Sequence, residues 1–98
     1  MVLCRIMPTA AFPHDHREFA ERTIVLNGKS VPYFEQVFWA SHAVNALLPA
    51  SVAPAGRSRS GLPVGLQIIG PHLEDRTPVA FAAQLADLLG GFVAPPGY

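Results

Sequence analysis

The sequence predicts an α/β fold in which a mixed sheet is flanked by helices. Residues 64–69 form an apolar run suited to a strand that is buried on both faces. Residues 33–48 and 77–89 carry apolar side chains at helical spacing. Strands and helices also alternate along the chain, and the connections permit parallel pairing through helical crossovers.

The N-terminal part predicts one strand followed by a loop. Residues 2–7 are apolar and rich in strand formers, and Pro8 stops the run, so we expect a strand that is largely buried on both faces. Residues 10–22 show no clear periodicity and are expected to form a loop, with one helical turn near residues 18–21. The lone Cys4 lies in the strand and is expected to be a buried, unreactive thiol.

A hairpin and a helix are predicted next. Residues 23–31 contain two β-prone arms around Asn27 and Gly28, the dipeptide best suited to a type I′ turn. Pro32 sets φ for a first helical turn, and a helix is expected over residues 33–48. Its apolar face would contain Phe34, Val37, Phe38, Val44 and Leu48.

The second half predicts two strands and a final helix. A short strand is expected at residues 50–53, and residues 64–69 are expected to form an interior strand whose one polar side chain, Gln67, needs a hydrogen-bond partner. Thr77 and Pro78 then suit the start of a helix over residues 77–89. Its buried stripe would contain Val79, Ala82, Leu85, Leu88 and Leu89, and Gly90 and Gly91 would end it.

The composition indicates that another polypeptide covers part of this fold. Charged residues are 14% of the chain, against about a quarter in an average soluble domain, and 50% of residues are hydrophobic. A small domain has much surface for its volume and normally needs more charge than this. Two helices also cannot cover both faces of a sheet of buried strands. We therefore expect a fragment of a larger sheet.

Several classes of function are disfavoured by the charge and hydropathy pattern. Seven basic residues balance seven acidic ones without any basic run, which argues against a nucleic-acid partner. Apolar stretches are far shorter than the roughly 20 residues that span a bilayer, and residues 1–12 lack the pattern of a signal peptide. A cytoplasmic protein is the expectation.

One motif in the second half resembles a known family. The residues Gly-Leu-Pro-Val-Gly-Leu-Gln-Ile-Ile-Gly-Pro occupy positions 61–71, and Glu74 and Asp75 follow at the start of an Ala- and Leu-rich helix. This pattern resembles the C-terminal signature of amidase-signature enzymes. The order of the other elements is similar across essentially the whole chain, through Met7-Pro8-Thr9, Val31-Pro32-Tyr33, Leu48-Pro49-Ala50 and Ala53-Pro54-Ala55-Gly56.

The resemblance implies that residues 1–98 are a single C-terminal segment of an amidase fold whose N-terminal catalytic portion is absent. Family members have a mixed central sheet with helices on both sides, which agrees with the cover inferred above. They hydrolyse carboxamide C–N bonds with a nucleophilic Ser, a bridging Ser and a Lys that acts as base, and backbone N–H groups of a glycine-rich loop stabilise the oxyanion. These residues lie N-terminal to the region that this chain resembles.

None of that machinery maps onto this sequence, so we expect no catalytic residue in it. The only lysine is Lys29, beside the predicted hairpin turn. Ser58 and Ser60 precede Gly61, but Arg57 and Arg59 replace the small residues that let backbone amides converge on an oxyanion. A flexible loop is the better interpretation.

No metal site or cofactor site is expected either. His14, Asp15 and His16 have side chains that bind metals, but ligands at i and i+2 need further ligands, and no second cluster supplies them. We interpret them as a polar loop. His42 and His72 suggest a Ser-His-Asp combination only by chance, because no Gly-x-Ser-x-Gly elbow is present. The aromatic residues Phe34, Phe38 and Trp39 are expected to pack in the core and at an interface.

Two hypotheses for the function, which belong to different classes, follow from these observations. In the first, the chain is the structural C-terminal part of an amidase, is inactive alone, and has the missing N-terminal portion as its partner. In the second, it folds independently as a self-associating or protein-binding module whose uncovered apolar surface is buried in an oligomer.

Overall fold

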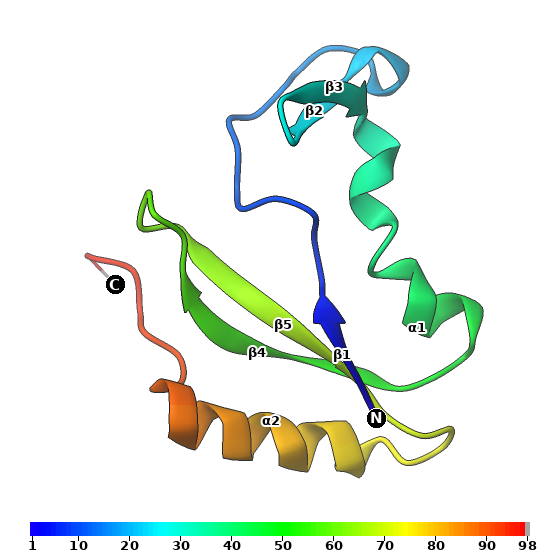
Figure 1. Ribbon diagram of the computed structural model, residues 1–98, viewed down its shortest axis with the longest axis vertical. Coiled ribbons are helices and arrows are strands. Elements are labelled where there is room, and N and C mark those ends of the chain that lie inside the picture. Colours follow the sequence, from blue (N-terminus) through cyan, green and yellow to red (C-terminus); the bar gives the residue numbers. More distant parts are fainter. Residues whose placement is uncertain (98) are drawn as a thin grey trace.

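The computed structural model describes residues 1–97 and has a three-stranded sheet at its centre. The strands are β1 (Val2–Arg5), β4 (Ala50–Arg57) and β5 (Pro63–Ile69), in the order β1-β5-β4. Figure 1 shows the sheet above helix α2 (Arg76–Leu89). The α/β class is thus confirmed, and the signature strand is the central one, as its apolar pattern predicts.

All pairing in this sheet is antiparallel, so the parallel pairing that the sequence permits does not occur. β5 runs antiparallel to β1, where Leu3 faces Ile68, and to β4, where Ser51 faces Ile68. β4 and β5 are joined by a short turn, which allows only a hairpin and leaves no room for a crossover helix. β4 is longer than predicted and contains a bulge between Pro54 and Gly56.

The two faces of β5 are covered by different elements. Gly70, at the end of the strand, lies against Pro78 of α2, whereas Gln67 bonds to Trp39 in residues 33–48, here called the aromatic segment. Because side chains alternate along a strand, Ile68 shares the α2 side with Gly70. Ile68 and Gln67 have 0% and 2% of their surface exposed. The small core of the molecule therefore sits around the C-terminal half of β5.

Helix α2 has the predicted span but buries less of its apolar surface than predicted. It begins after Asp75 and ends at Gly90, which has a φ of +89° that favours glycine. Pro78 is buried, yet Val79 and Leu88 are 59% and 80% exposed. The predicted stripe is therefore wrong at these positions and at Leu89, because the helix covers only β4 and β5 and no other element of residues 1–97 packs closely on its flanks.

Residues 33–48 form two short helices in place of the single helix predicted. A 3₁₀ helix, η2, spans Tyr33–Val37, and α1 spans Ser41–Asn45. Between them the carbonyl of Trp39 accepts bonds from the Gln67 amide and from the backbone N–H three residues later, which is not the i+4 pattern of an α-helix. Aromatic and β-branched residues also lower helix propensity here.

The hairpin is formed as predicted. β2 (Thr23–Leu26) and β3 (Lys29–Pro32) pair around Asn27 and Gly28, which both have positive φ as a type I′ turn requires. A 3₁₀ turn, η1 (Phe19–Glu21), precedes it. Ile24 is buried at 3% exposure. Four rings pack edge to face in this part of the molecule, namely Phe12, Phe19, Tyr33 and Phe34.

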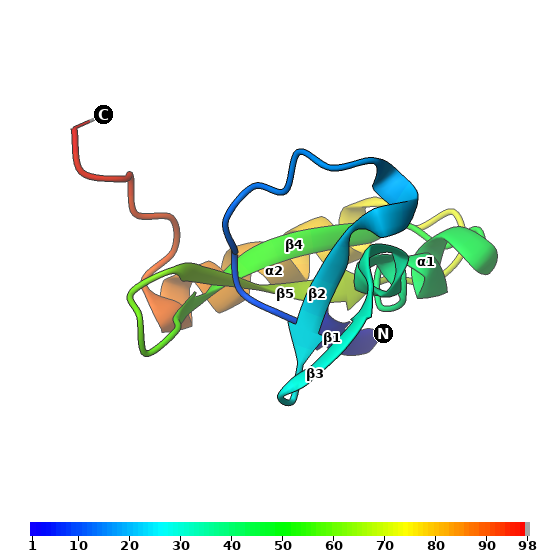
Figure 2. The same ribbon diagram turned by 90° about the horizontal axis from the view of Figure 1, so that it is seen from above.

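Packing is concentrated in two separate groups of elements. One contains the sheet and α2, and the other, here called the hairpin group, contains η1, η2 and the hairpin. The hairpin stands apart from the sheet in Figure 1 and lies in front of it in Figure 2, which looks from the hairpin side. The radius of gyration is 15.2 Å, against about 13 Å for a compact domain of this length. The accessible surface is 7367 Å², about 1,900 Å² more than a compact monomer of 10.5 kDa would have.

Candidate functional site

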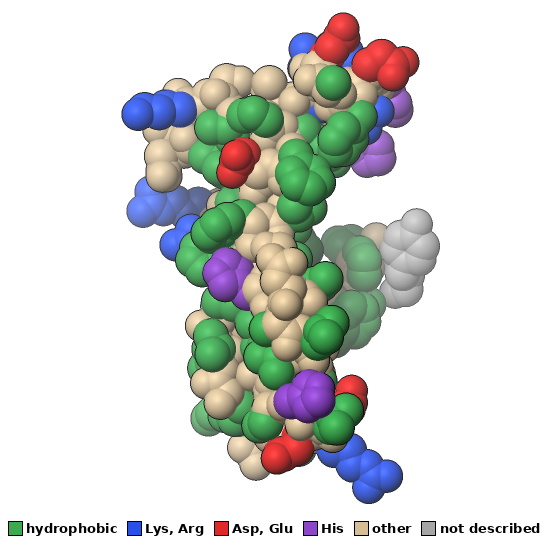
Figure 3. Space-filling model, turned by 90° about the vertical axis from the view of Figure 1, so that its right-hand side faces the viewer, with side chains coloured by type: hydrophobic (Ala, Val, Ile, Leu, Met, Phe, Trp, Pro, Cys, Tyr) green, Lys and Arg blue, Asp and Glu red, His purple; other side chains and the backbone are tan. Residues whose placement is uncertain are grey.

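The most extensive feature of the surface is its uncovered apolar area. Phe34 and Phe38 in the aromatic segment are 65% and 55% exposed, and Val44 on α1 is 70% exposed. In β1, Val2 and Leu3 are also about half exposed, at 57% and 48%. Figure 3 shows apolar side chains gathered along one side of the molecule with few charged ones between them. The prediction that β1 is buried on both faces is therefore wrong for this chain, because β1 is an edge strand that residues 1–97 leave largely uncovered.

An apolar groove lies between the segment that follows β1 and the first half of β5. It has a volume of about 610 Å³, and its walls include Ile6, Phe12, Ala55 and Val64. Thr9 also lines it, and the Oγ1 atom of this side chain is buried without a hydrogen-bond partner among residues 1–97. A buried hydroxyl without a partner costs about 1–3 kcal/mol. The groove therefore contains one unsatisfied polar group in an apolar setting.

Thr9→Val should raise the free energy of unfolding of this chain by about 1 kcal/mol, because valine keeps the shape and removes the unpaired hydroxyl. Urea denaturation followed by circular dichroism would measure the change. Thr77→Val is the matched control, since the Thr77 hydroxyl donates to Glu74 Oε2 at 3.0 Å and lies outside the groove. A loss of stability in Thr9→Val equal to that in Thr77→Val would contradict the assignment.

Gln67 connects the central strand to the aromatic segment. Its Nε2 donates to the Trp39 carbonyl at 3.3 Å and to Cys4 Sγ at 3.6 Å. This confirms the prediction that the one polar side chain of the strand bonds to a neighbouring segment. Cys4 is half-buried and not fully buried as expected. Across the same junction, the guanidinium of Arg5 lies 5.8 Å from the centre of the Trp39 ring.

His42 belongs to an aromatic cluster that the sequence pattern did not reveal. Its ring stacks on Trp39 with centroids 5.6 Å apart and an interplanar angle of 16°, and it meets Phe38 edge-on at 5.1 Å. Nδ1 lies 2.9 Å from the Phe38 carbonyl and 3.2 Å from the Trp39 carbonyl, so Nδ1–H is the donor. Phe38 and His42 line a shallow cavity of about 370 Å³ together with Ser41 and Asn45.

Ser58 and Ser60 form the turn between β4 and β5. Their Oγ atoms are 2.9 Å apart, and Ser58 Oγ accepts the backbone N–H of Leu62 at 3.1 Å. Arg57 closes the turn by donating to the Gly61 carbonyl at 3.0 Å. Within residues 1–97 no hydrogen bond joins Lys29 to either serine, and Lys29 lies in the hairpin group. The serines therefore act as turn-forming residues in this geometry.

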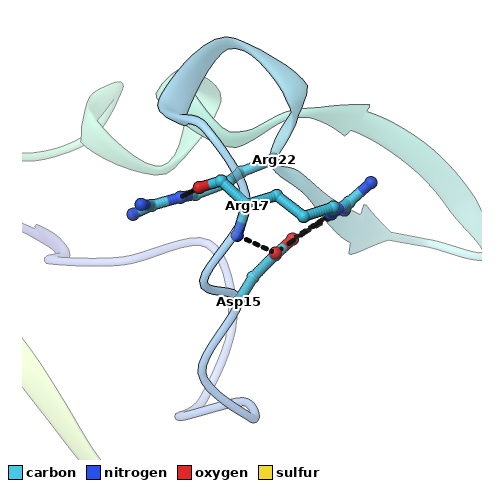
Figure 4. A network of polar contacts seen from close by, with 3 residues as sticks. All are labelled: Asp15, Arg17 and Arg22. Carbon is cyan, nitrogen blue, oxygen red and sulfur yellow. Dashed lines mark hydrogen bonds and ion pairs between the residues drawn. The ribbon is translucent and has the colours of Figure 1, made fainter.

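The loop at residues 13–17 holds a strong ion pair. Arg17 donates to both carboxylate oxygens of Asp15, with its Nη2 atom 2.6 Å from Oδ2 (Figure 4). The hydrogen bond from the Arg17 side chain is the main reason that the pKa of Asp15 falls to about 2. His14 and His16 flank this aspartate with ring centres 6.0 Å apart. Across residues 1–97, no three His, Cys, Asp or Glu side chains gather as a metal site would require.

Among the described residues, no helix has the length and apolar character needed to cross a bilayer. His72 is exposed just after β5. Within residues 1–97 it makes no hydrogen bond to either serine of the β4–β5 turn. The main features that a function must account for are thus the uncovered apolar surface, the apolar groove and the fixed central strand.

Comparison with known proteins gives a consistent answer. No family model matches the chain. It is 45% identical over 64 residues to a glutamyl-tRNA(Gln) amidotransferase subunit from Maricaulis maris (strain MCS10), and the match covers 65% of this chain and 13% of that protein. It is 42% identical over 48 residues to fatty-acid amide hydrolase 2-A of Danio rerio, covering 49% of this chain and 9% of that protein.

The matched segments thus span roughly a tenth of these curated relatives, both of which are amidase-signature enzymes. Two relatives with different names share this one family, and the motif at residues 61–71 resembles the C-terminal signature of that same family. Over the segments that these relatives share with it, the chain is similar to amidase-signature enzymes.

Proposed function

We propose that this chain is the C-terminal structural part of an amidase, and that the complete enzyme hydrolyses carboxamide C–N bonds. The isolated chain is inactive in this proposal, because the nucleophilic Ser, the bridging Ser and the Lys belong to the N-terminal portion. The observation that carries the proposal is the exposed apolar surface of a chain that is related to amidase-signature enzymes.

The size of that surface supports a large polypeptide partner. An excess of about 1,900 Å² over a compact monomer is comparable to the area that a specific protein interface buries in total. The exposed side chains belong to β1, α1, η2 and the flanks of α2, so several sides of the chain are uncovered. A single small ligand is too small to cover such a surface, whereas an N-terminal portion that packs around the sheet would cover it.

The chain's contribution in this proposal is a fixed scaffold. Gln67 ties β5 to Trp39, and Gly70 brings the end of β5 against α2, so the sheet, the aromatic segment and the helix keep one arrangement. The N-terminal portion would add further packing to both faces of this sheet. Its catalytic groups would then be held by a framework that neither part forms alone.

An exchange experiment tests the proposal. The M. maris amidotransferase protein would be prepared without its matching segment and, separately, with that segment replaced by these 98 residues. Ammonia release from a panel of simple carboxamides is expected to be absent in the truncated protein and in the isolated chain, and restored in the chimera. The chimera carrying Ile68→Ala serves as the control for a correctly packed sheet.

One result would contradict the proposal directly. Ammonia release by the purified chain, retained after Ser58→Ala and Ser60→Ala are combined, would place catalytic groups within these residues. Release that disappears in that double variant would instead assign catalysis to the β4–β5 turn. Either result would make the N-terminal portion unnecessary for the chemistry.

Self-association is a second candidate, favoured by the same apolar surface. An obligate homodimer buries about 2,000 Å² or more and is more hydrophobic than a transient complex, and the exposed area of this chain is of that size and character. Light scattering across a range of concentrations distinguishes the two candidates. A defined oligomer with cooperative unfolding favours self-association, whereas aggregation that is relieved by the truncated amidotransferase favours the first candidate.

A further inference from the structure

We propose that the loop before the hairpin binds a small oxyanion, the carboxylate or phosphate group of a ligand, through Arg22 and two histidines. The loop and the hairpin enclose a cavity of about 380 Å³, and Arg22, His14, His16 and Tyr33 line it. Arg22 and Tyr33 flank the hairpin and the two histidines lie in the loop before it, so none of the four belongs to the three-stranded sheet or to the β4–β5 turn. The site is therefore separate from the amidase function proposed above.

Arg22 is held in place before any ligand arrives. Its Nε donates to the Arg17 carbonyl at 2.7 Å, and its Cζ lies 5.9 Å from the centre of the Tyr33 ring. The side chain is half-buried, and in residues 1–97 its two terminal nitrogens, Nη1 and Nη2, have no hydrogen-bond partner. A planar guanidinium with a fixed Nε presents these two donors as a fork that matches two oxygens of an oxyanion.

The acidic residue that lines the same cavity, Asp15, makes no hydrogen bond to the Arg22 guanidinium. Asp15 is paired with Arg17 by hydrogen bonds to both carboxylate oxygens. Figure 4 shows that pair on one side of the Arg17 backbone and the Arg22 guanidinium on the other. Glu18 and Glu21 are exposed and do not line the cavity. The charge of Asp15 attracts Arg22, but the hydrogen bonds of this carboxylate are taken by Arg17, so the Arg22 Nη1 and Nη2 donors remain free for an anion.

The two imidazoles add further donors to the lining of the cavity. His14 and His16 have ring centres 6.0 Å apart and line the same cavity as Arg22. Each ring carries at least one N–H group that can donate to an anion. Two histidines with an adjacent arginine do not suit a divalent cation, because Arg22 brings positive charge and no third ligand is gathered within residues 1–97. The charges and donors together favour an anion.

NMR titration of the full chain tests the site. Inorganic phosphate and acetate would be added in separate experiments at constant ionic strength, with sodium chloride as the reference salt. Saturable shift changes are expected in backbone amides of residues 13–22. Tighter binding of phosphate than of acetate assigns the site to a phosphate group, and equal or tighter binding of acetate assigns it to a carboxylate. Because charge-assisted hydrogen bonds are lost, Arg22→Gln should weaken binding about tenfold or more.

Two further variants keep the result interpretable if Arg22→Gln unfolds the hairpin. His14→Gln combined with His16→Gln changes only exposed loop side chains and should weaken binding several-fold. Arg76→Gln removes an exposed arginine on α2 and should leave binding unchanged. Shift changes that do not saturate, that appear equally with chloride, or that Arg76→Gln reduces as much as Arg22→Gln would overturn the proposal. These outcomes are independent of ammonia release by the chimera.

Discussion

Ile68→Ala is expected to lower the free energy of unfolding by about 2–5 kcal/mol, the range for removing a large aliphatic side chain from a packed core. Ile68 is 0% exposed and lies in the middle strand, between Leu3 of β1 and Ser51 of β4. Its neighbours cannot move in easily, because β5 is held on both edges and α2 covers this face. The cavity left by the substitution would stay largely open.

The same substitution should lower the melting temperature by about 8 °C or more, since a domain of this size loses roughly 4–8 °C per kcal/mol. Thermal unfolding followed by circular dichroism measures the melting temperature of the chain. In the chimera, the effect of the substitution is followed by ammonia release. Val64→Ala is the control on the same strand, because Val64 is already 41% exposed and should cost about 1 kcal/mol or less. Equal losses in both variants would show that the core does not lie where the structure puts it.

Gly70→Ala should also destabilise the chain, by about 1–3 kcal/mol, the usual cost of overpacking. A Cβ atom at position 70 would lie 2.6 Å from Pro78 Cδ and 2.9 Å from Pro78 Cγ. A proline ring in the first turn of α2 cannot rotate away as a flexible side chain would. The backbone of Gly70 is also fixed, because its N–H donates to the Pro49 carbonyl at 2.8 Å.

A double-mutant cycle identifies the cause of that loss. Pro78→Ala removes the ring atoms that a new methyl group would meet, so the combined variant Gly70→Ala/Pro78→Ala should be less destabilised than the sum of the two single variants. Urea denaturation of all four proteins provides the comparison. Strict additivity would mean that the close approach of strand and helix is not the reason for a glycine at this position.

The sequence predicted well those elements whose signals are local. The apolar run at residues 64–69 became the central strand, Asn27 and Gly28 formed the expected turn, and α2 ended at Gly90. Each of these depends on a short run of residues with a definite backbone preference. The need of Gln67 for a partner was also predictable, because a buried amide requires a hydrogen bond.

Features set by distant parts of the chain were not predictable in the same way. The break in the helix at residues 33–48 arises where Gln67, far along the sequence, bonds to the Trp39 carbonyl. Strand direction depends on the length of the β4–β5 turn, which the apolar pattern does not fix. The stripe on α2 failed at Val79 and Leu88 because periodicity shows which face is apolar and not whether anything covers it.

The candidate sites also differ in how far the sequence predicted them. That Ser58, Ser60 and Lys29 are not catalytic stays a prediction, while the structure places the two serines in the β4–β5 turn and Lys29 in the hairpin. The cavity lined by Arg22 was missed, because His14 and His16 were considered only as metal ligands. The nearby Arg22 and Tyr33 were the signal, since an arginine next to two histidines indicates an anion more than a cation.

The two outer strands of the sheet differ in how they resist unwanted pairing. β4 has Pro54, which has no N–H to donate, and a bulge beside it, and both devices discourage an added strand. β1 has neither: in the part of the chain that the structure describes, its outer side pairs with no strand, and Val2 and Leu3 are exposed. A newly made chain would therefore be vulnerable to edge-to-edge aggregation at β1, and this edge would limit its yield in a cell for as long as it stays open.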